Sequence, residues 1–517
     1  MKRIISFALI LMLLISFAAC RRPDAPVSGN EPVAQPTAEP TEAPTEEPSA
    51  EPTEAAPTEE PLPTHMPDMN DGDDDNTPAI YAGNNVFFAV RPEGAVYAWG
   101  NNEYGQIPGR DGDALRPVYV GSGFTPVIVG DTVFALDSEH TLIGWGRNDR
   151  AQLGQGDAEK HDGTVKILEN VKKVLDRWGT YYALTEQGEL YAWSYSQYDE
   201  LEGAELVSAM TPHKVFENVR EFDKYFIITN DGELWESCGT GETSKLADGV
   251  QEAWGGAYPM AVCDTDGRLY ALTPNGMELI CDSYAYGDGT TGRGFLKVEV
   301  SDGVIWFLTV DGTLKRYTAS ESDVLAETDN LGELETIMNE VVDFDTATYM
   351  DEDWGYDYKF ALKANGELWS WAIYHGPILG KASYETCKTP ECVLTGVTSF
   401  TCSGAETYAV TANGEVWACG MGGEEGFIYG SLGDGTAEES YTFVNTGLTD
   451  ITRVLTHLEL VFIDYDDGTD GVRLYCRTFA VNKDGRLFAW GWNGDGLLGA
   501  GALDEVVLSP MEVYFTR

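Results

Sequence analysis

A single β-hairpin pattern recurs along most of this chain and constrains its fold more than any other feature. The copy from Tyr408 to Gly420 reads YAVTANGEVWACG, with two alternating apolar runs on either side of Asn413-Gly414. An Asn-Gly pair in this position is a strong hairpin signal, because a two-residue type I′ turn needs positive φ at both central residues. The segment is therefore predicted to be a hairpin closed by a type I′ turn.

Eight further segments repeat this pattern, so the chain is a repeat protein. They begin at Phe87, Val133, Tyr181, Tyr225, Met260, Trp306, Lys359 and Thr478. In the copy from Val133, Glu139-His140 replaces the turn glycine. A repeat of roughly 45 residues accommodates four short strands, which make one propeller blade. Each unit of this kind needs a neighbour to bury its apolar face, so the pattern predicts an all-β ring of blades.

The best copies also resemble the repeat of the regulator of chromosome condensation (RCC1) family. They read VYAWGNNEYGQIPG from Val96, LIGWGRNDRAQLGQGD from Leu142 and LFAWGWNGDGLLGAG from Leu487. The resemblance covers residues 79–517 and implies an RCC1-like β-propeller with seven blades, whereas the hairpin count reaches nine. Either the ring is larger than seven blades, or some hairpins are not blades.

Residues 1–20 are predicted to be a lipoprotein signal peptide. A basic pair at residues 2–3 precedes an apolar run (4–17) that is shorter than the ~20 residues a membrane-spanning helix needs. The small-small-Cys ending at Cys20 resembles a bacterial lipobox. This resemblance implies a lipid on Cys20 that anchors the exported protein to the outer face of the bacterial cell membrane. The alternative is an ordinary signal peptide with an incidental cysteine.

Residues 21–78 form a segment rich in Pro, Thr and Glu with almost no aliphatic side chains. Such a composition cannot offset the entropy of ordering the chain, so we expect a disordered linker between the lipid and the propeller. Proline stiffness and the repulsion between like charges lengthen this linker.

The chain carries a formal net charge of -52, which limits its partners. Nucleic acids need stripes of Lys and Arg, so a nucleic-acid ligand is not expected. The same charge separates this chain from the chromatin-binding member that gave the family its name. Neither nucleosome binding nor nucleotide exchange on a small GTPase is therefore carried over from the resemblance. Contact with a membrane is expected only through the lipid on Cys20.

The remaining cysteines and histidines form no recognisable metal, cofactor or catalytic motif, so a binding protein is predicted rather than an enzyme. Cys387 and Cys392 bracket a short loop and are the one local pair that could form a disulfide. Cys419 occupies the repeat position held by Trp99 and Trp145, which predicts a buried thiol in an apolar core.

The hairpin turns place the remaining connections on one face. If each turn joins the second and third strands of a blade, the first-to-second and third-to-fourth connections emerge on the opposite face. We call this the long-loop face. It collects residues 101–115, 148–163, 195–210, 374–390, 421–440 and 492–504, and two enlarged first-to-second loops, 345–358 and 464–471.

The two enlarged loops are the predicted binding surface. Their aromatic and acidic side chains suit a protein partner or stacking on a sugar, while packing between loops is the alternative for each aromatic residue. The candidate residues are Tyr349, Asp351, Asp353, Trp354, Tyr356, Tyr465, Asp466 and Asp467. Strand-like flanks around 464–471 predict a long projecting hairpin, one blade away from the other loop. A protein partner is expected, and glycan binding or processing is the alternative function.

Overall fold

The structure is a computed structural model, and it describes residues 77–83, 85–177, 179–195, 209–236, 243–256, 258–285, 291–301, 303–318, 332–350, 355–372, 376–382, 388–423, 428–464, 470–502 and 504–515. These residues belong to one compact unit, His65–Arg517. The predicted signal peptide, the lipid site at Cys20 and nearly all of the predicted linker lie outside the described residues. Within the described ranges, no helix is long and apolar enough to cross a membrane.

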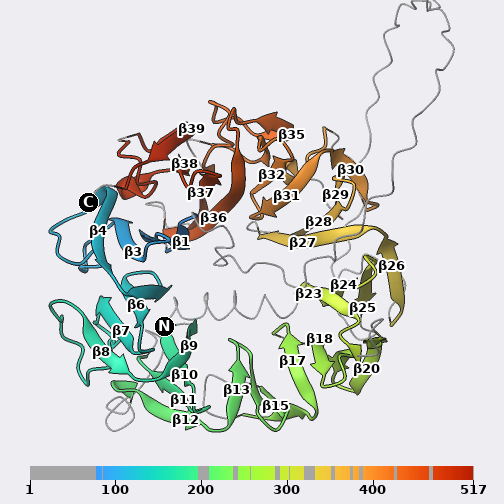
Figure 1. The fold of residues 1–517 in the computed structure, drawn as a ribbon, viewed down its shortest axis with the longest axis horizontal. Coiled ribbons are helices and arrows are strands. Elements are labelled where there is room, and N and C mark those ends of the chain that lie inside the picture. Colours follow the sequence, from blue (N-terminus) through green and yellow to red (C-terminus); the bar gives the residue numbers. More distant parts are fainter. Residues whose placement is uncertain are drawn as a thin grey trace, which may run out of the picture. The chain divides into compact units, whose positions relative to one another are not determined.

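In the described residues, nine blades follow one another around a ring in chain order (Figure 1). Each blade is an antiparallel set of four strands, and the first strand lies innermost. In the last blade, a short strand from the preceding connection also pairs parallel with the second strand. Blades 1 to 3 comprise β1 (Ala79–Ala82), β2 (Val86–Val90), β3 (Ala95–Gly100), β4 (Ala114–Ser122), β5 (Phe124–Ile128), β6 (Thr132–Asp137), β7 (Leu142–Gly146), β8 (Val165–Leu168), β9 (Val171–Arg177), β10 (Thr180–Thr185), β11 (Leu190–Trp193) and β12 (His213–Phe216).

The next six blades follow the same order. Blades 4 to 6 comprise β13 (Val219–Phe222), β14 (Phe226–Thr229), β15 (Leu234–Glu236), β16 (Lys245–Ala247), β17 (Val250–Trp254), β18 (Met260–Asp264), β19 (Leu269–Thr273), β20 (Gly276–Cys281), β23 (Phe295–Ser301), β24 (Val304–Thr309), β25 (Leu314–Thr318) and β26 (Leu334–Met338). Blades 7 to 9 comprise β27 (Val341–Met350), β28 (Gly355–Lys363), β29 (Leu368–Ala372), β30 (Glu391–Leu394), β31 (Val397–Cys402), β32 (Glu406–Thr411), β33 (Val416–Gly420), β35 (Ser440–Asn445), β36 (Ile451–Asp464), β37 (Asp470–Asn482), β38 (Leu487–Trp492) and β39 (Val506–Val513). The connections hold β21 (Tyr284–Ala285), β22 (Thr291–Gly292), β34 (Ile428–Tyr429) and two 3-10 helices, η1 (Pro377–Leu379) and η2 (Gly494–Gly496).

All nine hairpins found in the sequence are the second and third strands of blades. The ring therefore has nine blades, and the seven that the resemblance implies must be corrected. Even the copy without a turn glycine forms its blade, because His140 adopts the left-handed conformation with φ 58°.

The hairpin turns differ from the expected type I′ geometry. The amide of Gly414 donates to the carbonyl of Thr411 (2.7 Å), and the amide of Thr411 donates to the carbonyl of Glu415 (3.0 Å). Gly414 has φ +71°, while Asn413 does not have positive φ. This pattern is a three-residue loop with a glycine bulge. The hairpin was predicted correctly, but its turn type was wrong.

These turns also join consecutive blades. The carbonyl of Gly414 accepts a hydrogen bond from the amide of Ile451 in the next blade (3.0 Å), and the amide of Ala412 donates to the carbonyl of Gly396 (2.9 Å). A Cβ on Gly414 would lie 2.8 Å from the backbone nitrogen of Asp450. Polar groups of the turn face are therefore engaged in holding the ring together.

A second contact between blades uses the tryptophan at the end of the third strand. Its indole N–H donates to a backbone carbonyl in the preceding blade's third-to-fourth connection: Trp99 to Leu497 (2.9 Å), Trp145 to Gln106 (2.8 Å) and Trp193 to Gln152 (2.7 Å). Cys419 is fully buried, as predicted, and its thiol donates to the carbonyl of Ile378 (3.2 Å) in the same way. Because Leu497 belongs to blade 9, the Trp99 contact closes the ring without a strand shared between the two ends.

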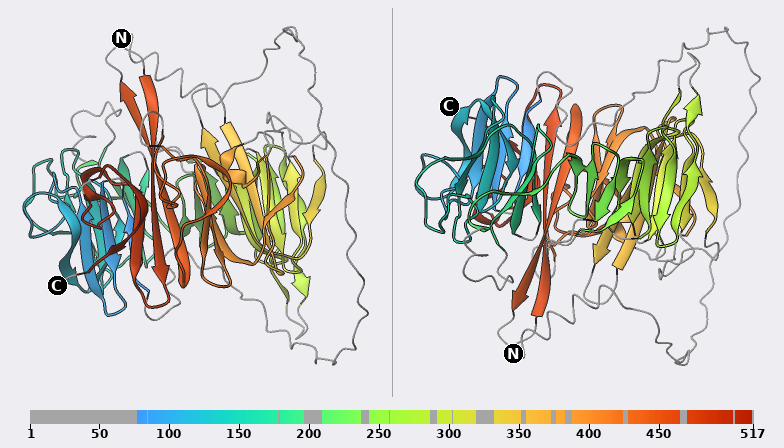
Figure 2. Two further views of the ribbon diagram at one scale, coloured as in Figure 1. Left: turned by 90° about the horizontal axis from the view of Figure 1, so that it is seen from above. Right: turned by 90° about the horizontal axis from the view of Figure 1, so that it is seen from below.

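The two enlarged first-to-second connections are both hairpins that extend beyond the blades on the same side of the ring (Figure 2). The β36–β37 hairpin was predicted. Residues 345–358 were expected to be a loop, but most of them continue β27 and β28, which pair as far as Met350 opposite Gly355. The turn face is also less uniform than expected, since β21–β22 lies in the connection between blades 5 and 6.

Candidate functional site

The described residues include only part of the predicted binding surface. Tyr349 and Tyr356 lie directly opposite each other near the end of the β27–β28 hairpin. The other six candidates lie outside the described residues: Asp351, Asp353, Trp354, Tyr465, Asp466 and Asp467. Cys392 is exposed on β30 and Cys387 is not described, so their disulfide stays a prediction.

A groove of about 670 Å³ lies beside the β27–β28 hairpin. It is lined by the connection after β13 and the first residue of β14, by the end of β17 and the connection after it, and by residues of the inner strands β23 and β27. Those connections join first and second strands, so the groove opens at the long-loop face. Its volume falls in the range of pockets that bind small ligands or several side chains of a partner.

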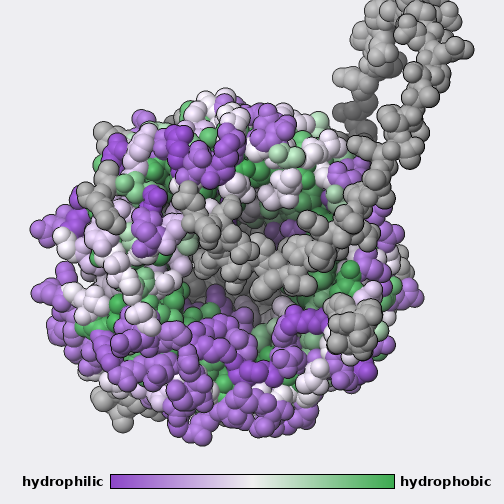
Figure 3. Space-filling view, in the orientation of Figure 1, coloured by the Kyte–Doolittle hydropathy of each residue, from purple (hydrophilic) through white to green (hydrophobic). Residues whose placement is uncertain are grey.

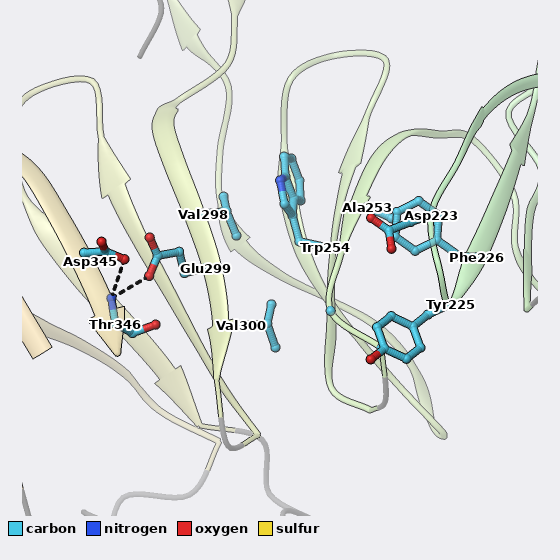
Figure 4. A pocket seen from close by; sticks show the side chains of 12 residues that line it. Asp223, Tyr225, Phe226, Ala253, Trp254, Val298, Glu299, Val300, Asp345 and Thr346 are labelled. Atoms are coloured by element: carbon cyan, nitrogen blue, oxygen red, sulfur yellow. Dashed lines mark hydrogen bonds between the residues drawn. The ribbon is translucent and has the colours of Figure 1, made fainter. Parts of the chain in front are cut away.

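The groove has two chemically different ends (Figure 4). Glu299 and Asp345 form the acidic end, and Tyr225 and Trp254 form the aromatic end, which also holds the carboxylate of Asp223; Val300 lies between the two ends. The Tyr225 residue is 43% exposed, whereas Trp254 is half-buried. Aromatic side chains beside carboxylates provide both stacking area and charge within one hollow.

Two glycines shape the aromatic end of the groove. Gly255 adopts φ +94°, and a Cβ there would lie 3.2 Å from the side chain of Val300. A Cβ on Gly256 would lie 2.7 Å from the ring of Tyr225. Because these two glycines have no side chains, the chain can turn tightly after Trp254, and Tyr225 stays at the rim of the groove.

A lysine stands behind the acidic end. The Nζ of Lys297 donates to Glu299 (2.8 Å) and Asp343 (3.4 Å) and also to the carbonyl of Phe344. Burial alone would lower the pKa of Lys297, but the carboxylates of Asp343, Glu299 and Asp345 raise it. Burial raises the pKa of each of these three carboxyl groups. Three carboxylates therefore surround a single cation.

The carboxylates at the acidic end are also fixed by the backbone. The amide of Thr346 donates to Glu299 (2.9 Å) and to Asp345 (2.9 Å), as Figure 4 shows. The second oxygen of Asp345 accepts from the thiol of Cys402 (3.5 Å). Within the described part of the chain, no group of His, Cys, Asp or Glu could hold a metal ion. At the acidic end of the groove, the positive charge comes from the ammonium group of Lys297.

The same lysine contact occurs between blades 3 and 4, but with fewer charges. Lys173 pairs with Glu221, donates to the carbonyl of Phe222 (2.8 Å) and lies over its ring. Both lysines are the third residue of an inner strand. Two positions further along, blade 3 has Leu175, whereas blade 6 has Glu299. The lysine contact between blades therefore does not require Glu299.

The sequence did not predict the groove, because the residues that line it come from four different blades. One signal was present: VREFD from Val219 and VVDFD from Val341 repeat an acidic–aromatic–acidic pattern at the same strand position. The glycine pair after Trp254 was a second signal, since it removes side chains from a blade connection.

Comparisons with known proteins agree with this architecture. Residues 79–106 and 484–517 match the family described as the regulator of chromosome condensation (RCC1) repeat. The ultraviolet-B receptor UVR8 of Arabidopsis thaliana is 29% identical over 130 residues, which cover 23% of this chain and 30% of the receptor. The E3 ubiquitin-protein ligase HERC2 of Homo sapiens is 24% identical over 386 residues, which cover 73% of this chain and 7% of the ligase. The matched part of the chain thus spans less than a third of either relative.

Among solved structures, Prp20p from Saccharomyces cerevisiae is 13% identical, with 88% of this chain and 91% of that chain covered and a TM-score of 0.38. A structure of yeast RCC1 (Prp20) with Kap60 bound is also 13% identical, covering 91% and 92% of the two chains with a TM-score of 0.39.

Proposed function

Since the protein is a β-propeller of RCC1-type repeats, we propose that it is an exported binding module, tethered by a lipid on Cys20, that takes a protein partner on its long-loop face. Propellers of this repeat type are generally protein-interaction modules. The linker of residues 21–78 would hold the ring away from the membrane.

The projection of two hairpins from one face is the observation that carries this proposal. The β27–β28 and β36–β37 hairpins extend beyond the ring on the same side and are separated by one blade (Figure 2). The turn face uses its backbone groups for contacts between blades, so it offers fewer free groups for recognition. Loops and hairpins that stand on a rigid scaffold are the usual carriers of binding residues.

A carbohydrate ligand is the second candidate. The exposed ring of Tyr225 and the indole of Trp254 lie in one groove with carboxylates, a composition that also suits sugars. A panel of polysaccharides and chromogenic glycosides tests this function. Turnover that a single carboxylate substitution abolishes would replace the protein-binding proposal with an enzymatic one.

The direct test is capture of partners by the intact chain and by a variant with both hairpins shortened. Residues 349–356 and 462–472 are each replaced by Asn-Gly, which keeps the Thr348–Asp357 and Val461–Arg473 pairs. This design also keeps Asp357, which pairs with the buried Lys359 (2.7 Å). The variant should fold normally and lose the partners that the intact chain captures from an extracytoplasmic extract.

The control variant replaces residues 284–291 on the turn face, again with Asn-Gly. It should capture the same partners as the intact chain. The proposal fails if the shortened hairpins leave capture unchanged, or if the turn-face variant loses the partner while the hairpin variant keeps it.

A further inference from the structure

We propose that the groove on the long-loop face is the docking site for a basic segment of the protein partner. A Lys or Arg side chain of that segment is seated against the acidic end, and its apolar neighbours lie against the aromatic end. The inference rests on the proposed protein-binding function and adds the chemistry of the partner.

The first step is the surplus of negative charge at the acidic end. The Lys173 contact between blades 3 and 4 forms with Glu221 and Asp223 at the strand positions of Asp343 and Asp345, and with Leu175 at the position of Glu299. At the groove, one lysine is shared among Glu299, Asp343 and Asp345. Buried charge without a full complement of opposite charge is costly, so this arrangement favours a second cation.

The second step is access to this charge. Glu299 and Asp345 both line the groove, and the Glu299 side chain is 19% exposed, so a ligand can reach it from the open side. The third carboxylate, Asp343, does not line the groove. A cation entering the groove therefore meets the two carboxylates that the Thr346 amide holds in place.

The third step is the remainder of the groove, where apolar and aromatic side chains surround the carboxylate of Asp223. Val298 and Val300 separate the two ends in Figure 4, and Trp254 packs edge-on against Phe295 with ring centroids 5.8 Å apart. This contact fixes the indole, and Tyr225 stays at the rim. A peptide that alternates basic and apolar side chains can place one kind at each end, because successive side chains of an extended segment point in opposite directions.

A basic segment fits the groove better than a neutral sugar. A sugar would stack on the aromatic end but would leave the surplus negative charge uncompensated. The chain's formal charge of -52 also attracts cationic partners and raises their rate of association.

The test uses a fluorescently labelled peptide, Arg-Leu-Arg-Leu-Arg with blocked ends, and the full chain. The comparison peptide has citrulline in place of each arginine, which keeps the shape and removes the charge. Anisotropy at about 0.15 M salt, where weak surface attraction is screened, should show binding of the arginine peptide. The citrulline peptide should bind at least about tenfold more weakly.

Two variants locate the binding site. The double variant Glu299→Gln/Asp345→Asn should weaken binding of the arginine peptide at least about tenfold. Tyr225→Ala should also weaken it, and this change leaves the lysine cluster intact. The matched control, Glu438→Gln/Glu439→Gln, removes two exposed charges from the connection between β33 and β35 on the same face and should leave binding within about twofold.

The inference is overturned if the arginine peptide does not bind, if the control variant weakens binding as much as the groove variant, or if the citrulline peptide binds equally well. Saturable binding of a neutral oligosaccharide that competes with the peptide would also overturn it. None of these measurements uses the captured partner. A negative result would therefore overturn the groove assignment, while the protein-binding proposal would still be decided by the capture experiment with the shortened hairpins.

Discussion

The buried carboxyl group of Glu406 should make the stability of the ring depend on pH. Glu406 is fully buried between blades 8 and 9. One oxygen accepts from Tyr408 (3.0 Å) and Thr478 (3.4 Å), while the other has no hydrogen-bond partner among the described residues. Burial raises the pKa of Glu406 from 4.5 to about 8, although the two hydrogen bonds oppose this change.

The sign of the effect follows from proton binding. Between pH 4.5 and about 8 the folded chain keeps the proton on Glu406, whereas the unfolded chain releases it. The stabilisation that the protonated Glu406 carboxyl group contributes is therefore fully present below pH 4.5 and is lost as the pH rises to about 8. At about 1.4 kcal/mol per pKa unit, this difference corresponds to about 5 kcal/mol of unfolding free energy.

The assay is urea unfolding followed by tryptophan fluorescence at pH values from about 5 to 9. In Glu406→Gln the side chain cannot ionise, so this variant should lose less stability than the parent as the pH rises. Glu439→Gln, which changes an exposed residue, should follow the parent. Parallel pH profiles for the parent and Glu406→Gln would refute the reasoning.

Three further predictions concern the turns, the contacts between blades and the lipid. In urea unfolding, Gly414→Ala should lower the free energy of unfolding by at least about 1 kcal/mol more than Gly94→Ala does. An added Cβ meets the backbone of the next blade at Gly414, whereas at Gly94 it meets nothing within 4 Å. Equal losses in the two variants would contradict this prediction. Trp145→Phe should destabilise the ring by about 2 kcal/mol, since it leaves the carbonyl of Gln106 without its 2.8 Å hydrogen bond and shrinks a buried ring; unchanged denaturant midpoints would contradict it. Cys20→Ser should release the protein from the membrane fraction or leave it unprocessed, and unchanged fractionation would rule out the lipid anchor.

The repeated hairpin could be read from the sequence because it is a local feature. Alternating apolar residues and a turn glycine specify the two strands from Tyr408 to Gly420 without reference to the rest of the chain. The buried position of Cys419 followed from its alignment with Trp99. The turn type did not follow, since an Asn-Gly pair also fits a bulged loop in which the glycine alone is left-handed.

The groove could not be predicted, because ring closure determines which blades meet. Tyr225, Trp254, Glu299 and Asp345 belong to four blades and are far apart in the sequence. No local sequence pattern indicates that these residues line one groove. The length of the β27–β28 hairpin was also missed, since acidic residues have weak strand preference, yet Asp345 pairs with Phe360 and Asp357 pairs with Thr348.

The most direct measurement of the binding proposal is site-specific photocrosslinking from the two faces of the ring. A photoreactive residue is placed at Tyr225 on the long-loop face or at Glu139, which is exposed on a hairpin turn. Illumination of cells that produce the full chain should yield a protein adduct from position 225 and none from position 139. An adduct from position 139 alone would contradict the assignment of the long-loop face as the binding surface.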